Sequence, residues 1–95
     1  MVLRTRKGKE AEALILAAIH DLWEERGYAP TVREIGARVG LAHSAVHGYI
    51  RALGEAGLVH DEPHIARSLR LSPAGRSRIR AARRAKLLEG AVAAQ

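Results

Sequence analysis

Polar side chains recur at helical spacing in the middle of the 95-residue chain. His43, His47 and Arg51 follow one another at intervals of four residues, and Ser44 comes directly after the first of them. Residues four apart lie on one face of an α-helix. Imidazole, hydroxyl and guanidinium groups match the donors and acceptors that base edges and phosphates offer. The spacing therefore indicates a helix over residues 43–56 whose exposed face reads a nucleic acid.

The same histidines have the spacing of a metal-ligand pair. His43 and His47 stand at i and i+4, but the chain has no cysteine and no carboxylate lies near them in the sequence. His60 and His64 flank two acidic residues and are a weaker candidate for metal sensing. Contact with DNA is favoured over both, so no metal and no cofactor are expected. The chain has no glycine-rich phosphate loop and no spaced set of serine, histidine and acid, which argues against an enzyme.

Apolar residues at three- and four-residue spacing predict a first helix over residues 9–26. Its inward face is expected to hold Ala11, Leu14, Ile15, Ala18, Ile19, Leu22 and Trp23. A glycine and a proline then end this helix. Thr31 and Glu34 have the spacing of a capping box, which starts a second helix over residues 32–39.

The residues after this second helix are those of a helix-turn-helix. Gly36 lets two helices cross closely, and Gly40 supplies the positive φ of a tight turn. The side chains of Ile35, Val46 and Tyr49 would hold the two helices together. This packing leaves the opposite face of the third helix for the DNA major groove, which is wide enough to admit an α-helix.

Two short strands are predicted over residues 58–61 and 67–71, around Pro63. Ser72 and Pro73 suit the cap and the first position of a last helix. The expected fold class is mostly α with a small β-hairpin: a winged helix-turn-helix of three helices and a wing, followed by a C-terminal helix. The chain divides into a basic N-terminal arm (residues 1–9), the winged domain (10–72) and a basic C-terminal helix (73–95).

The charge is concentrated at the two ends of the chain. The formal net charge is +6 and the pI is about 10.8. Residues 1–10 carry +3 and residues 73–95 carry +5, whereas residues 11–72 carry −2. A basic balance of this size in a small domain suggests a nucleic-acid partner. Without an export signal or an apolar run long enough to span a membrane, a cytoplasmic, nucleoid-associated protein is expected, with no membrane partner.

The two basic ends have readings that stay open. The C-terminal helix would be an arm on DNA if its basic residues touch phosphates: Arg76, Arg80, Arg83 and Arg84. It would instead pair two copies of the chain through an apolar stripe of Ala81, Ala85, Leu88 and Val92. A solvated or frayed helix is the third reading. The N-terminal residues form either an arm that tracks a groove or a flexible terminus: Arg4, Arg6, Lys7 and Lys9.

Three segments of the winged domain carry one resemblance to a known family. Residues 26–36 read Arg-Gly-Tyr-Ala-Pro-Thr-Val-Arg-Glu-Ile-Gly, residues 39–42 read Val-Gly-Leu-Ala, and residues 46–50 read Val-His-Gly-Tyr-Ile. They resemble the N-terminal DNA-binding domain of LexA-type SOS repressors. The resemblance implies a repressor that reads a palindromic operator in double-stranded DNA, and we expect it to act as a homodimer.

The resemblance also implies a role for each matching residue. Thr31 and Arg33 would meet phosphate at the N-terminus of the second helix. The residues that face base edges would be His43, Ser44 and His47, to which the spacing adds Arg51. On the wing, Arg67 would lie against DNA.

Three departures from the LexA pattern change what is expected. The turn before the third helix is one residue shorter, which predicts a different operator sequence. The wing segment 60–64 is acidic or neutral, so Asp61 and Glu62 would repel phosphate. The self-cleaving peptidase half is missing from these residues, so no effector or inducing signal is implied. A second class of function stays open, namely a small module that docks on a transcription or replication protein.

Overall fold

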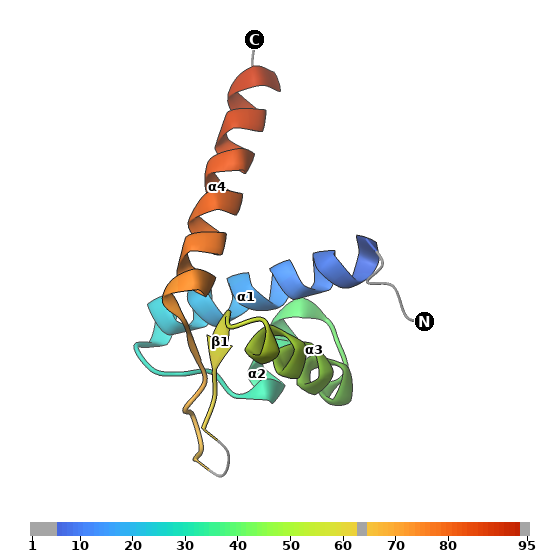
Figure 1. Ribbon diagram of the computed structural model, residues 1–95, viewed down its shortest axis with the longest axis vertical. Coiled ribbons are helices and arrows are strands. Elements are labelled where there is room, and N and C mark those ends of the chain that lie inside the picture. Colours follow the sequence, from blue (N-terminus) through green and yellow to red (C-terminus); the bar gives the residue numbers. More distant parts are fainter. Residues whose placement is uncertain (1–5, 63–64, 94–95) are drawn as a thin grey trace.

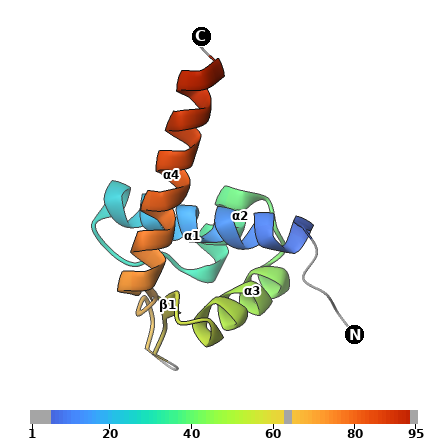
Figure 2. The same cartoon turned by 45° about the horizontal axis from the view of Figure 1, so that its top comes forward.

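The computed structural model describes residues 6–62 and 65–93 (Figures 1 and 2). The elements in chain order are α1 (Arg6–Arg26), α2 (Val32–Val39), α3 (His43–Glu55), β1 (Val59–His60), β2 (Arg70–Leu71) and α4 (Pro73–Ala93). The predicted winged helix-turn-helix, mostly helical with one small hairpin, is confirmed. None of the described helices is long and apolar enough to cross a membrane.

The helix α1 supplies much of the core. It packs against α2, α3, β2 and α4, and its most buried side chains are Ile15, Leu16, Ile19 and Leu22. The prediction that Leu14 faces inward is wrong, because its side chain is 56% exposed. Leu16 is buried in its place. These two positions lie about 200° apart around a helix. The elements that pack on α1 therefore cover Leu16 and leave Leu14 in solvent.

The start of α1 differs from the prediction, whereas its end agrees. The helix begins at Arg6 rather than at residue 9, so the last part of the predicted N-terminal arm is helical. Residues 1–5 of that arm, including Arg4, lie outside the described residues. At the other end Gly27 has a φ of +76°, and its N–H donates to the Trp23 carbonyl at 2.8 Å.

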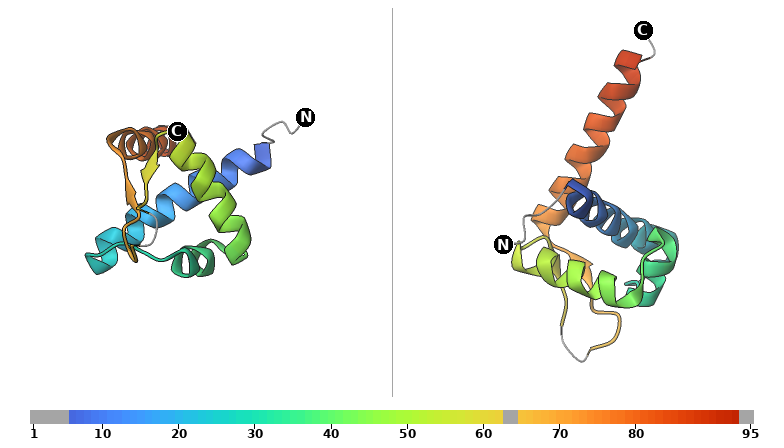
Figure 3. Two further views of the ribbon diagram at one scale, coloured as in Figure 1. Left: turned by 60° about the horizontal axis from the view of Figure 1, so that its bottom comes forward. Right: turned by 90° about the vertical axis from the view of Figure 1, so that its right-hand side faces the viewer.

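The strands β1 and β2 pair antiparallel, with Val59 opposite Leu71 and His60 opposite Arg70. This register places both residues of the Val59–Leu71 pair in the core and both residues of the His60–Arg70 pair in solvent. The hairpin is the predicted wing, and its buried side leans on α3 and α1. In Figure 3 it extends from the same side of the body as α3.

Both strands are shorter than predicted, because a side chain replaces the backbone ladder beyond the second pair. The Glu62 N–H donates to Ser68 Oγ at 2.9 Å instead of to a carbonyl across the hairpin. Arg67 also has a φ of 56°, which is a left-handed conformation and not that of a strand. The alternation of apolar and polar residues predicted longer strands, but the residues beyond the two pairs form a turn instead.

The helix α4 begins against the wing and then leaves the body. Ser72 Oγ accepts a hydrogen bond from the Gly75 N–H at 3.0 Å, which confirms the predicted cap. A Cβ on Gly75 would lie 2.1 Å from the Leu58 carbonyl oxygen, so this close contact requires glycine. Ile79 is buried, and residues 80–89 after it are all exposed. Figures 1 and 3 show α4 projecting away from the side that holds α3 and the wing.

Candidate nucleic-acid interface

Two glycines set the crossing of α2 and α3. A Cβ on Gly36 would lie 2.8 Å from the Leu41 carbonyl oxygen and 3.5 Å from Val46. Gly40 has a φ of 74° in the left-handed region, and its N–H donates to the Gly36 carbonyl at 2.8 Å. Both roles predicted for these glycines are confirmed. The crossing turns Val46 into the core and leaves the opposite face of α3 in solvent.

A capping box fixes the start of α2, as predicted. The Glu34 N–H donates to Thr31 Oγ1 at 3.1 Å, and the Thr31 N–H donates to Glu34 Oε1 at 2.7 Å. The hydrogen bond from the Thr31 backbone, with smaller contributions from its hydroxyl and from Arg67, lowers the pKa of Glu34 from 4.5 to about 2 against the effect of desolvation. Glu34 is thus a firmly ionised carboxylate beneath the α2 N-terminus.

The side chains predicted to read bases share the exposed face of α3. All four are exposed: His43, Ser44, His47 and Arg51. The buried side chains of this helix lie on its other face: Val46, Ile50 and Leu53. The polar face is therefore separate from the face that packs, and its side chains are exposed among the residues that the structure describes.

A groove runs between this face and the first strand of the wing. The polar residues that line it from α3 are Ser44, His47 and Arg51, together with Gly48 and Gly54. From the wing, His60 and Asp61 form the other wall. The groove therefore places donors and acceptors from two elements along one surface.

The two histidines at the start of α3 contact each other. The ring centroids of His43 and His47 lie 4.7 Å apart with an interplanar angle of 85°, an edge-to-face arrangement. Among the described residues, no three His, Asp or Glu side chains gather where they could hold a metal ion. The two imidazole rings are in contact with each other at the start of the exposed face of α3.

The acidic residues of the wing are tied to their neighbours. The Ser68 hydroxyl donates to Asp61 Oδ1 at 2.8 Å. His60 Nε2 lies 3.9 Å from Glu62 Oε1, which is an ion pair when the imidazole is protonated. A protonated His60 would therefore reduce the repulsion between the wing and phosphate. His64 lies outside the described residues.

Arg67 lies on the wing, as predicted, but its guanidinium points to the connection between α1 and α2. Nη1 donates to the Ala29 carbonyl at 2.9 Å and to Glu34 Oε1 at 3.0 Å. The guanidinium carbon lies 4.8 Å from the centre of the Tyr28 ring. These contacts hold the wing against the N-terminus of α2, and the side chain remains 43% exposed.

Several arginines of the winged domain are neutralised by carboxylates. Arg38 makes two hydrogen bonds to Glu25, each of 2.8 Å. Arg26 and Arg67 both bind Glu34. The arginines of this domain that form no ion pair with any described residue are Arg33, Arg51 and Arg70. On the side of α2 and α3, therefore, two cations are free to bind phosphate, and both were predicted to contact DNA.

The four arginines predicted as a tail site do not form one cluster. Arg83 Nη2 donates to Asp21 Oδ1 at 2.7 Å and so ties α4 to α1. Arg80 donates to a serine within α4 at 3.3 Å. Arg84 is exposed and forms no ion pair with a described residue. Arg76, in the first turns of α4, borders a hollow on another side of the body.

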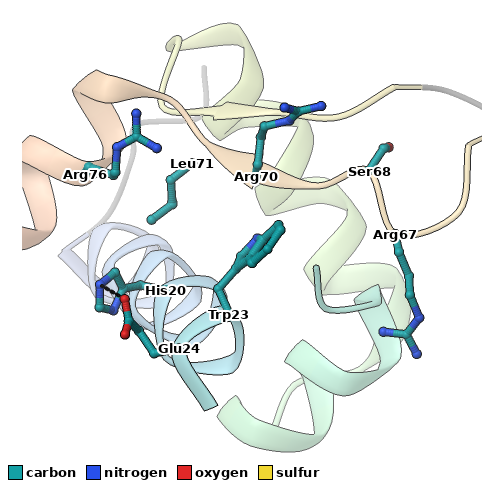
Figure 4. A pocket seen from close by; sticks show the side chains of 8 residues that line it. All are labelled: His20, Trp23, Glu24, Arg67, Ser68, Arg70, Leu71 and Arg76. Atoms are coloured by element: carbon teal, nitrogen blue, oxygen red, sulfur yellow. Dashed lines mark ion pairs between the residues drawn. The ribbon is translucent and has the colours of Figure 1, made fainter. Parts of the chain in front are cut away.

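This hollow lies between α1, the wing and the start of α4 (Figure 4). Its wall includes His20, Trp23, Glu24, Arg70, Leu71 and Arg76. The Trp23 indole N–H donates to the Leu69 carbonyl at 3.2 Å, so the ring packs between helix and wing while it stays 37% exposed. No residue of α3 lines the hollow, which is therefore separate from the reading face.

His60 and Gly48 line the groove but were not among the predicted site residues. His60 was considered for metal sensing alone, yet its exposed side chain lies across the groove from α3. The alternation of buried Val59 with exposed His60 in the strand was the signal that could have found it. A Cβ on Gly48 would meet nothing within 4 Å, so packing gives no reason for a glycine in the middle of α3.

Comparison with known proteins identifies a family. The model of the LexA DNA binding domain matches residues 6–68. The chain is 48% identical over 63 residues to the LexA repressor of Lacticaseibacillus casei (strain BL23), which covers 65% of this chain and 30% of the relative. It is 43% identical over 68 residues to the LexA repressor of Limosilactobacillus reuteri (strain DSM 20016), with 70% of this chain and 33% of the relative covered.

The LexA repressor of Enterococcus faecalis (strain ATCC 700802 / V583) is 41% identical over 66 residues, which are 68% of this chain and 32% of the relative. The chain thus matches about a third of the length of these relatives. The matched region holds the capping box, the two turn glycines and the polar face of α3. The chain belongs to the LexA DNA-binding domain family.

Proposed function

We propose that this protein is a transcriptional repressor that binds double-stranded DNA in a sequence-specific manner, with α3 in the major groove. The exposed polar face of α3 beside the wing carries this proposal. It is a helix face of the kind that a major groove accommodates, and no part of the body packs on it. Membership of the LexA DNA-binding domain family supports it, as does the name LexA repressor of the relatives.

The polar residues of this surface have separate tasks in the proposal. His43, Ser44 and His47 meet base edges, where an imidazole or a hydroxyl can both donate and accept a hydrogen bond. Arg51 lies toward the wing on the same face and reads a base or binds a phosphate. Contacts to phosphate position a protein on the duplex, whereas contacts to base edges give specificity.

The N-terminus of α2 supplies the phosphate contacts. Arg33 is exposed and forms no ion pair with a described residue, and the Thr31 hydroxyl, which interacts with Glu34 in the capping box, turns to a phosphate from that position. Glu34 already occupies the Thr31 N–H, so this backbone N–H is not the phosphate donor. Arg67 serves chiefly to position the wing, because its guanidinium is bound to Glu34 and Ala29.

The protein acts as a homodimer on a palindromic operator in this proposal. A single α3 reads only a few base pairs, and dimers of helix-turn-helix proteins bind two half-sites about one helical turn apart. Few free cations on the reading side also mean that one domain alone binds phosphate weakly. Occupying both half-sites within a promoter would prevent transcription from starting there.

A docking module for another protein is the alternative, favoured by the net charge of −2 over residues 11–72. Selection of bound sequences from random duplex DNA separates the two functions. We expect enrichment of a palindrome with two half-sites. Failure to enrich any sequence would contradict DNA reading and favour the protein partner.

Substitutions in α3 test which residues read the sequence. His47→Ala and Arg51→Ala should each reduce discrimination between operator and random DNA by ~1–3 kcal/mol, the value of one good base contact. Arg76→Ala, in the first turns of α4 and away from α3, is the matched control and should keep the discrimination of the unchanged protein. Equal weakening on operator and random DNA would show that the substituted residue binds phosphate and does not read bases.

A further inference from the structure

The outward face of α4 is a small-residue stripe that the body does not cover. Ala81 follows the buried Ile79 by two residues and therefore lies on the opposite side of the helix. The stripe and its border form a shallow groove lined by Ser77, Arg80, Ala81, Arg84, Ala85 and Leu88. Leu88 is 60% exposed. Among the described side chains of α4 beyond Ile79, none is buried.

The spacing along this stripe is that of a coiled-coil seam. Ala81, Ala85 and Leu88 alternate at steps of four and three residues, as positions d, a and d of a heptad do. In that register Arg84 takes a g position and Glu89 takes the e position five residues later. Neither of them forms an ion pair with a described residue of its own chain.

We propose that α4 pairs in parallel with α4 of a second copy along this stripe, and that Arg84 of each copy forms an ion pair with Glu89 of the other. This inference rests on the proposed homodimer and assigns the surface that makes it. In a parallel two-stranded coil a g residue faces the e residue five positions later on the partner. The two-fold axis therefore repeats the pair of opposite charges on both sides of the seam.

The direction of α4 favours the parallel arrangement. The helix projects away from the side that holds α3 and the wing (Figure 3). A parallel pair has its two-fold axis along the helices, so both bodies lie at one end and both α3 helices face the same way. A palindromic duplex also has a two-fold axis perpendicular to its length, which coincides with this one. An antiparallel pair would place the bodies at opposite ends and turn the reading faces apart.

The length of the free seam predicts a weak dimer in solution. Only about two heptads of α4 extend past Ile79, and small residues bury little apolar area. Binding to two half-sites then adds to the association, because DNA holds both copies at high effective concentration. Dimer formation should therefore be visible at high protein concentration, and as cooperative binding to a palindrome.

A charge exchange tests the pairing. Arg84→Glu and Glu89→Arg each place like charges across the seam and should each raise the dimer dissociation constant about tenfold in sedimentation equilibrium. The double variant R84E/E89R should restore it. Arg84→Glu also adds an attraction to Arg80 four residues earlier, so a weaker helix cannot explain its loss of dimer. Arg76→Glu, outside the seam, is the charge-matched control and should leave the dimer unchanged.

A second pair of variants tests the apolar seam. Leu88→Ala should weaken the dimer by tenfold or more, whereas Leu87→Ala should not, because Leu87 lies outside the stripe and is 75% exposed. A chain that stays monomeric at all concentrations, equal effects of the two leucine substitutions, or a double charge variant that fails to recover would each overturn the proposal.

Binding to a single half-site keeps this inference distinct from the proposed function. Variants of α4 should lose cooperativity on the palindrome and keep the affinity of one copy for a half-site. If the protein binds a half-site normally but does not pair through α4, the proposed seam is rejected and the proposed function stands. Absence of any half-site preference, together with a dimer that responds to the charge exchange, would reject DNA reading alone.

Discussion

The guanidinium of Arg67 lies 3.0 Å from the carboxylate of Glu34 and so joins the wing to the N-terminus of α2. The same carboxylate accepts the Thr31 N–H and binds Arg26. One acidic residue thus closes the capping box and holds two arginines. The wing is therefore positioned by the helix-turn-helix itself and not by its two short strands alone.

Glu34→Gln should make the protein less sensitive to acid. The pKa of Glu34 in the folded protein is about 2, below its ordinary value of 4.5. A carboxyl with a lowered pKa stabilises the fold above its unfolded-state pKa, and this stability is lost as the pH falls toward the folded-state value. The free energy of unfolding of the unchanged protein should therefore fall between about pH 5 and pH 2, and that of Glu34→Gln should fall less steeply.

Urea denaturation at a series of pH values measures both slopes. Glu55→Gln, at the exposed end of α3, is the control and should follow the unchanged protein. At neutral pH the Glu34→Gln variant should already be less stable than the control. Parallel pH curves for all three proteins would contradict the role given to Glu34.

Gly75→Ala should loosen α4 from the wing. The added Cβ would lie 2.1 Å from the Leu58 carbonyl oxygen, and that oxygen also accepts the Ser72 N–H at 3.0 Å. Either the first turn of α4 or the strand must move, at a cost of ~1–3 kcal/mol of unfolding free energy. Gly54→Ala is the matched control, since its Cβ would meet only Val59 at 4.0 Å and alanine favours a helix. A Gly75→Ala protein as stable as the control would mean that α4 does not dock as described.

Local spacing was sufficient to predict the helices that carry the site. The range of α2 is as predicted and that of α3 differs by one residue, because a capping box, two left-handed glycines and apolar periodicity agree there. The exposed face of α3 follows from the same periodicity. Contacts between distant segments gave no such signal: the bond of Arg67 to Glu34 spans 33 residues, and the contact of Gly75 with Leu58 depends on how α4 meets the wing.

Removing single charges from α2 and α3 should lower the salt dependence of DNA binding. Each phosphate contact contributes ~0.9 to the slope of log affinity against log salt. Arg33→Gln should reduce the slope by about one phosphate contact on a half-site duplex, and Arg51→Gln should do so if its guanidinium binds a phosphate instead of a base. Arg80→Gln is the control, because α4 projects away from the reading side, and it should leave the slope unchanged. A lower slope for Arg80→Gln would instead support α4 as an arm on DNA.

Gly48→Ala should stabilise the fold and weaken DNA binding at the same time. A glycine inside a helix costs ~0.5–1 kcal/mol relative to alanine, and a Cβ at this position would meet nothing within 4 Å in the protein. Gly48 lines the groove between α3 and the wing, so the space is best explained by a DNA backbone or base edge that approaches α3. Thermal unfolding should show a raised midpoint, and operator affinity measured on the same preparation should fall by about tenfold or more. A raised unfolding midpoint together with a lowered operator affinity would show that the glycine is required for binding. If the glycine were required for folding, its substitution would lower the stability of the protein. An alanine variant that is more stable and binds the operator as before would leave no role for close approach at this position.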